Sequence, residues 1–168
     1  MQLIEINKAR YRRHLNLVIA GCIGGLVIGS LAISQTLIYL FPDESGRHFH
    51  WNLLGVVLAS LSITGLLNKF HRHDFMTEVV YVWKLKQSLN RINRKMPKLK
   101  IASNAGNADA LLVMQYSYAG SRLLWHLDDN TIVLDELTSQ QIELDRIAAM
   151  FELTLNVQDY DESLLAQF

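Results

Sequence analysis

The stretch LNLVIAGCIGGLVIGSLAISQTLIYLF, residues 15–41, contains no charged side chain. At about 1.5 Å per residue, an α-helix over this stretch is roughly 40 Å long. The hydrocarbon core of a bilayer is about 30 Å thick, so such a helix can cross it with tilt or with overhang at its ends. We therefore predict a transmembrane helix over about residues 15–41.

A second apolar stretch, residues 49–70, follows after a short connection. As a helix its uncharged centre measures roughly 25 Å, and Trp51 near its start is of the type that favours the headgroup boundary. We predict a second transmembrane helix over about residues 50–68. The alternatives are a core helix of a soluble protein for either stretch and a cleaved signal peptide for the first. Apolar residues continue past the length of a typical signal peptide, which favours two spans.

Basic residues gather on one side of these two stretches. The connecting loop, residues 42–48, contains only Arg47, beside two acidic residues. The positive-inside rule then places both termini in the cytoplasm and the loop outside. The flanking cations are Lys8, Arg10, Arg12 and Arg13 before the first stretch, and Lys69 and Arg72 after the second.

Small residues recur at four-residue spacing in both predicted spans. Gly21, Gly25 and Gly29 form a stripe in the first, and Gly55 and Ala59 repeat in the same way in the second. Small residues let helix backbones approach closely in lipid, where the hydrophobic drive between helices is weak. We expect these residues to pack helices, either the two spans of one hairpin, which we favour, or two copies of the chain.

The rest of the chain, residues 74–168, is expected to form a mostly helical cytoplasmic domain after the hairpin of residues 1–73, giving an all-α fold. An apolar stripe indicates a helix that continues from the second span with a bend near His71, and Pro97 is expected to end it. Asn107 is a plausible N-cap for a helix to about Leu127. The members of the stripe are Val82, Leu85, Leu89, Ile92 and Met96.

Further signals follow toward the C-terminus. Thr138 and Gln141 fit a capping box for a helix to about Glu152. Alternation over residues 153–157 permits a short strand, and residues 131–134 permit a short extended piece. The acidic tail from residue 159 is either a final short helix or disordered.

The formal net charge is zero, but the charges are divided along the chain. Residues 1–100 carry fourteen Lys/Arg and five Asp/Glu, and residues 101–168 carry two Lys/Arg and eleven Asp/Glu. A basic cluster beside a membrane can contact anionic lipid headgroups. A solvated face, or contact with the acidic half of the chain, is the alternative, and nucleic acid is an unlikely partner. The cluster comprises Lys84, Lys86, Arg91, Arg94, Lys95, Lys98 and Lys100.

Side chains that often carry chemistry do not form a recognisable site in the sequence. The pairs His48/His50 and His71/His73 lie at opposite ends of the second stretch, so they cannot share one metal ion within a chain. A calcium loop beginning at Asp128 lacks the required glycine and glutamate. The single cysteine, Cys22, lies in the first apolar stretch. We therefore expect no enzyme, no cofactor and no metal.

One resemblance covers nearly the whole chain. The basic N-terminus before a Gly-rich span, the short loop and the segment Leu127-Asp128-Asp129-Asn130-Thr131-Ile132 resemble a group of small gammaproteobacterial inner-membrane proteins, catalogued only as a domain of unknown function. The resemblance implies a bacterial inner membrane and adds no activity, substrate or functional residue.

The expected function is therefore that of a non-enzymatic membrane protein. Its helical module is expected to act in interaction or anchoring, with membrane lipid, a second copy or another membrane protein as partner. The alternatives are a membrane element that responds to anionic lipid and a subunit of a membrane enzyme or transporter.

Overall fold

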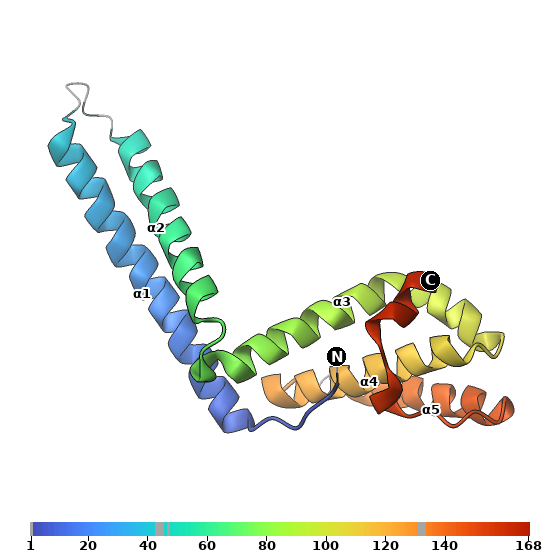
Figure 1. The fold of residues 1–168 in the computed structure, drawn as a ribbon. Coiled ribbons are helices and arrows are strands. Elements are labelled where there is room, and N and C mark those ends of the chain that lie inside the picture. The colour runs from blue at the N-terminus through green and yellow to red at the C-terminus, as the bar shows by residue number, and fades with distance from the viewer. Residues whose placement is uncertain (1, 43–45, 47, 131–133) are drawn as a thin grey trace. The chain divides into compact units, whose positions relative to one another are not determined.

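The computed structural model describes residues 2–42, 46, 48–130 and 134–168, and these residues contain helices and no strand (Figure 1). The all-α prediction is therefore confirmed for the described part of the chain. The internal contacts divide the chain into two units, one of residues 9–80 and one of residues 1–8 together with 81–168. Each unit is described by itself below.

The unit of residues 9–80 contains a pair of long helices joined by the loop. Helix α1 spans Lys8–Leu40 and α2 spans Phe49–Phe70. α1 begins several residues before the predicted span, because good helix formers such as Lys8, Ala9 and Arg10 extend it. The predicted turn at residues 42–48 lies mostly outside the described residues.

Both helices are long and apolar enough to cross a membrane. Only 6% and 11% of the residues in their most apolar stretches are buried in the structure. A core helix of a soluble protein is mostly buried, and soluble monomers rarely expose large contiguous apolar patches. The exposure of these helices therefore argues against the soluble-core alternative within this chain.

The junction after α2 differs from the predicted continuous helix. α2 ends at Phe70, and a short 3₁₀ helix, η1, spans Asp74–Met76 before α3 begins at Thr77. His73 has an extended backbone, and its Nδ1 accepts a hydrogen bond from the backbone N–H of Phe75 at 3.2 Å. The predicted bend near residues 71–74 is thus a break between two helices, started by a capping histidine.

The second unit is built from α3 (Thr77–Asn104, within this unit from Tyr81), α4 (Ala108–Asp128), α5 (Leu134–Met150) and two short 3₁₀ helices, η2 (Val157–Asp159) and η3 (Glu162–Gln167). The predicted stripe of α3 faces its core, with Met96 half-buried and the other four members buried. The buried stripe packs against α4, where the side chains of Leu85 and Leu89 lie close to Gly120.

Pro97 does not end α3, as the sequence predicted. The helix continues through it to Asn104. A proline inside a helix lacks one N–H donor and crowds the preceding turn, which bends the helix rather than always ending it. α3 changes direction in its second half (Figure 1), and burial of Leu99 at 0% exposure and Ser103 at 1% holds the continued helix in place.

The predicted cap of α4 is confirmed. The side chain of Asn107 accepts a hydrogen bond from the backbone N–H of Ala110 at 2.9 Å. The helix ends at Asp128, one residue beyond the predicted end, and Asp129 adopts a left-handed conformation with φ 55°. Its apolar side chains from Leu111 to Leu127 are buried or half-buried, so α4 is the central helix of this unit.

The predictions for the C-terminal third are wrong in two places. α5 already includes Leu134, so Thr138 lies inside it, and the Thr138 hydroxyl donates to the backbone carbonyl of Leu134 instead of capping. Residues 153–156 are irregular and Val157 starts η2, so no strand forms there. The extended piece predicted for residues 131–133 lies outside the described residues. Of the two alternatives for the tail, the short helix is found, as η3.

Candidate functional sites: the hairpin interface and the basic face of α3

Small residues form the contact between α1 and α2. A Cβ atom added to Gly29 would lie 3.5 Å from the Cβ of Ala59, and one added to Gly25 would lie 3.6 Å from Cδ1 of Ile63. Nothing lies within 4 Å of such an atom on Gly21. The structure therefore brings two members of the predicted stripe against the second helix and leaves Gly21 outside that contact.

The closest approach of the two helices is at Gly55, which sequence analysis had grouped with the packing residues. A Cβ atom here would lie 2.8 Å from the backbone oxygen of Ser30 and 3.0 Å from the backbone nitrogen of Ser34, and would clash with the Ser34 hydroxyl. Ser34 is 4% exposed. Sequence analysis missed Ser34, although its four-residue spacing from Ser30 continues a face of small residues on α1.

The two ends of the hairpin have different chemistry. At the loop end the rings of Phe41 and Trp51 stack with centroids 5.5 Å apart. At the other end Arg10 Nε lies 2.9 Å from Oε1 of Glu78, and His14 stacks on Phe75 at 4.1 Å. The loop end is therefore held by an aromatic pair, and the other end by an ion pair and a ring stack.

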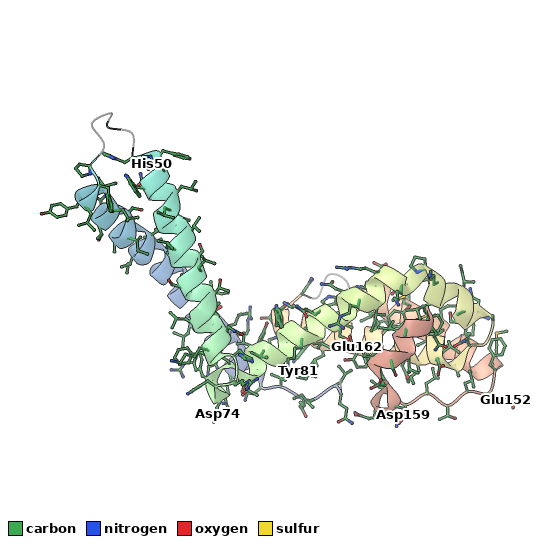
Figure 2. The ribbon with its side chains drawn as sticks, turned by 45° about the horizontal axis from the view of Figure 1, so that its top comes forward. His50, Asp74, Tyr81, Glu152, Asp159 and Glu162 are labelled. Atoms are coloured by element: carbon green, nitrogen blue, oxygen red, sulfur yellow. The ribbon has the colours of Figure 1, made fainter. Side chains whose placement is uncertain are left out.

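The predicted histidine pairs stay apart. Figure 2 labels His50 near one end of α2 and Asp74 near the other. His48 is two residues before His50, and His73 directly precedes Asp74, so the two pairs lie at opposite ends of this helix. The described residues contain no group of three His, Cys, Asp or Glu side chains that could hold a metal ion. His73 instead caps η1, so its local role is structural.

Cys22 borders an apolar cavity of about 330 Å³ between α1, α2 and the segment that follows α2. Gly21, Gly25 and Cys22 line it from α1, and Phe70 lines it from α2. The lining is almost entirely apolar, and His73, which also lines the cavity, caps η1.

The basic cluster of α3 contacts the acidic half of the chain. Lys86 Nζ lies 3.0 Å from Oδ2 of Asp128, and Arg91 forms an ion pair with Glu162. Lys95 and Lys98 each donate to a backbone oxygen of the C-terminal segment: Leu165 at 2.6 Å and Phe168 at 2.7 Å. The remaining members, Lys84, Arg94 and Lys100, are exposed.

This arrangement has a simple electrostatic cause. Carbonyl groups at the C-terminal end of a helix carry partial negative charge and attract cations. Lys95 and Lys98 donate to the backbone oxygens of Leu165, near the end of η3, and of Phe168, the residue after it. Of the alternatives raised from the sequence, contact with the acidic half therefore accounts for four of the seven cations.

The C-terminal segment is also attached by aromatic rings and hydroxyls that sequence analysis did not single out. Tyr160 stacks on Tyr116 of α4, and the Ser88 hydroxyl is near enough to both phenols to lower their pKa. Burial has the larger, opposite effect and raises the pKa of Tyr116 to about 12. None of the three oxygens makes a hydrogen bond of normal geometry in the structure. There was little indication of this contact in the sequence, because tyrosines in an apolar helix such as α4 are ordinarily core residues.

Asp128 and Asp129, at the start of the rejected calcium loop, take other partners. Asp128 pairs with Lys86, and Asp129 pairs with Lys8 of the N-terminal segment. That segment is held further by Tyr81, whose hydroxyl accepts from the N–H of Ile4 at 2.9 Å and donates to the carbonyl of Gln2 at 3.2 Å. Residues 2–8 thus belong to the second unit.

The fold and these surfaces define an all-helical protein with two helices capable of spanning a membrane and a helical module stabilised by charge pairs between its halves. The chain belongs to the family described as Protein of unknown function (DUF3087), which matches residues 1–165. It has no significant match among curated proteins or among solved structures. The resemblance to an uncharacterised family is thereby confirmed, and the family supplies no activity.

Proposed function

We propose that the protein is an integral membrane protein of a bacterial inner membrane, in which the hairpin of α1 and α2 anchors the helical module. Both termini are then cytoplasmic. One observation carries this proposal: two adjoining helices of sufficient length present their apolar side chains outward, while six of the seven flanking cations lie at one end. Lipid is the solvent that such a surface requires.

Extraction and topology together test the anchor. The protein should stay in the membrane pellet after extraction with alkaline carbonate, and only detergent should release it. In a Cys22→Ser background, Pro42→Cys should react with a membrane-impermeant maleimide in spheroplasts, and Gln158→Cys should react only after lysis. The opposite labelling pattern would reverse the orientation, and a protein that remains in the supernatant without detergent would overturn the anchor.

Within this role, we infer that the helical module works by interaction and not by catalysis. Four of the seven cations in its basic cluster are engaged by contacts within the chain, such as Lys86 with Asp128 and Arg91 with Glu162. Mild crosslinking in native membranes, followed by gentle solubilisation, should recover an oligomer or a stoichiometric partner. A monomer without partners at native expression would contradict this role and leave the anchor untouched.

A second candidate function is a response to anionic lipid. Arg94 is exposed beside Arg91 and Lys95 and lines a cavity with them. Juxtamembrane cations of this kind are attracted to anionic headgroups at about 1 kcal/mol each near the surface.

A further inference from the structure

The C-terminal segment occupies one face of α3 through three evenly spaced cations. Arg91, Lys95 and Lys98 are four and three residues apart, so they lie on one side of the helix. Arg91 holds the Glu162 carboxylate, and the two lysines hold backbone oxygens of η3. Glu162 and α3 are visible together in Figure 2. The face is therefore an anion-binding surface whose present occupant belongs to the chain.

A cavity of about 360 Å³ adjoins this contact. Arg91, Arg94 and Lys95 line it from α3, and Glu162, Leu165 and Ala166 line it from η3. Arginine guanidinium groups bind carboxylate and phosphate with the same forked geometry. A phosphate group that entered here would meet two guanidinium groups and one ammonium group, and would take the place of the Glu162 carboxylate.

The segment is attached more firmly at one end than at the other. Tyr160 is 4% exposed and stacked on Tyr116, whereas the side chains of Arg91 and Glu162 are 56% and 46% exposed. Exposed ion pairs contribute little to stability and weaken with salt. Within residues 162–168 only Leu165 is buried, so release of these residues from α3 exposes one apolar side chain while Tyr160 keeps the start of the segment in place.

We propose that Arg91, Arg94 and Lys95 form a binding site for the phosphate of an anionic phospholipid headgroup, and that Glu162 is the internal ligand which this headgroup displaces. The proposal rests on the membrane anchor proposed above, since α3 begins only a short turn after α2 and keeps the site tethered to the bilayer. It makes the C-terminal segment a lipid-released latch, which frees the last residues of the chain for a partner.

The test uses the full chain in nanodiscs of phosphatidylcholine alone or with phosphatidylglycerol. In a Cys22→Ser background, Leu165→Cys places a thiol at a position that is 5% exposed while η3 is docked. Its reaction rate with maleimide should rise at least fivefold with phosphatidylglycerol. Leu144→Cys, at a 1% exposed position in α5, is the matched control and should not change. A parallel rise at both positions means unfolding and overturns the latch.

Two further variants separate the roles of the residues. Arg94→Gln removes one of the two guanidinium groups that line the cavity, so it should abolish the rise with phosphatidylglycerol. Glu162→Gln should raise the rate in phosphatidylcholine toward the value seen with anionic lipid. If Leu165→Cys weakens docking by itself, the mobility of a spin label at the exposed Ala166→Cys position gives the same comparison.

The remaining arms identify the source of the phosphate. Inorganic phosphate added to phosphatidylcholine nanodiscs should not change the rate, because it lacks the high local density of a bilayer surface; an equal rise would overturn the lipid assignment. If the reaction rate of Leu165→Cys with maleimide is the same in both lipid compositions, the latch is overturned and the membrane anchor is unaffected. Failure of the chain to enter nanodiscs at all would remove the anchor and the latch together.

Discussion

The rings of Tyr116 and Tyr160 are stacked, with centroids 3.8 Å apart and planes inclined by 20°. Tyr116 belongs to the central helix α4 and is fully buried, and Tyr160 lies between η2 and η3. The stack thus fixes the beginning of the C-terminal segment on the core of its unit. Beyond Tyr160 the segment is held differently, by the Arg91–Glu162 ion pair, by hydrogen bonds from Lys95 and Lys98 and by the buried Leu165.

Replacing Tyr160 with alanine should remove the stack and leave a cavity beside Tyr116. Loss of a large buried aromatic side chain typically costs about 3–5 kcal/mol. We expect a fall of that size in the free energy of unfolding of the helical unit, measured by denaturation of the detergent-solubilised chain. Tyr160→Phe is the control: it keeps the ring and removes a hydroxyl without a regular hydrogen bond, so its cost should stay within about 1 kcal/mol. Equal losses in both variants would show that the ring contributes nothing.

The same two tyrosines, Tyr116 and Tyr160, should make the free energy of unfolding fall at high pH. Burial, and after it the neighbouring phenols and Glu162, raise the pKa of Tyr116 to about 12, and the pKa of Tyr160 is raised in the same direction. The folded state then binds the proton more tightly than the unfolded state does. The stabilisation is complete below about pH 10 and is lost as the pH rises from about 10 to about 12.

The size of this effect follows from the shift of Tyr116. A pKa raised from 10 to about 12 corresponds to roughly 3 kcal/mol. Unfolding measured between pH 8 and 11.5 should become easier over the upper part of that range in the wild type. The decrease in the free energy of unfolding with pH should be smaller in Tyr116→Phe than in the wild type. Equal decreases would contradict the assignment of this effect to Tyr116.

The sequence predicted features that depend on neighbours along the chain. The long uncharged runs, the apolar stripe of α3 and the cap at Asn107 were all found. Each arises within one helix, so periodicity or a single side chain is enough to indicate it. For the same reason two members of the glycine stripe were found at the contact with α2.

Features that depend on tertiary packing were predicted incorrectly or missed. Pro97 looked like a helix end, but burial of Leu99 and Ser103 outweighs the lost hydrogen bond. Thr138 resembled an N-cap, but the helix begins earlier, at Leu134, and its interior position follows from that start. Contact of the basic cluster with the acidic half was raised as an alternative, but the particular pairs, about seventy positions apart, follow no local pattern.

The cap of α4 provides a local test of stability. Asn107→Ala removes the acceptor for the N–H of Ala110 at the start of the central helix. The expected loss is about 1 kcal/mol in the free energy of unfolding. Asn104→Ala, at an exposed position at the end of α3, is a matched control that should change it little. Asn107→Asp should keep most of the stability, because a carboxylate also caps. If Asn107→Ala left the free energy of unfolding unchanged, packing alone would fix the start of this helix.

The hairpin interface distinguishes packing within one chain from packing between copies. Gly55→Ala places a methyl group against Ser34 and the backbone oxygen of Ser30, so the helices must separate, at a cost of about 1–3 kcal/mol. Gly21→Ala meets nothing within 4 Å and should be neutral or slightly stabilising, since alanine favours the helix.

Thermal unfolding of the two variants in detergent, together with crosslinking in native membranes, separates these cases. We expect Gly55→Ala to lower the unfolding temperature and Gly21→Ala to leave it unchanged. If Gly21→Ala instead abolishes a crosslinked dimer while the monomer keeps its stability, the free end of the glycine stripe packs against a second copy. Because Gly25 and Gly29 already contact α2, the stripe then serves both contacts along its length, with Gly21 as the residue specific to the dimer.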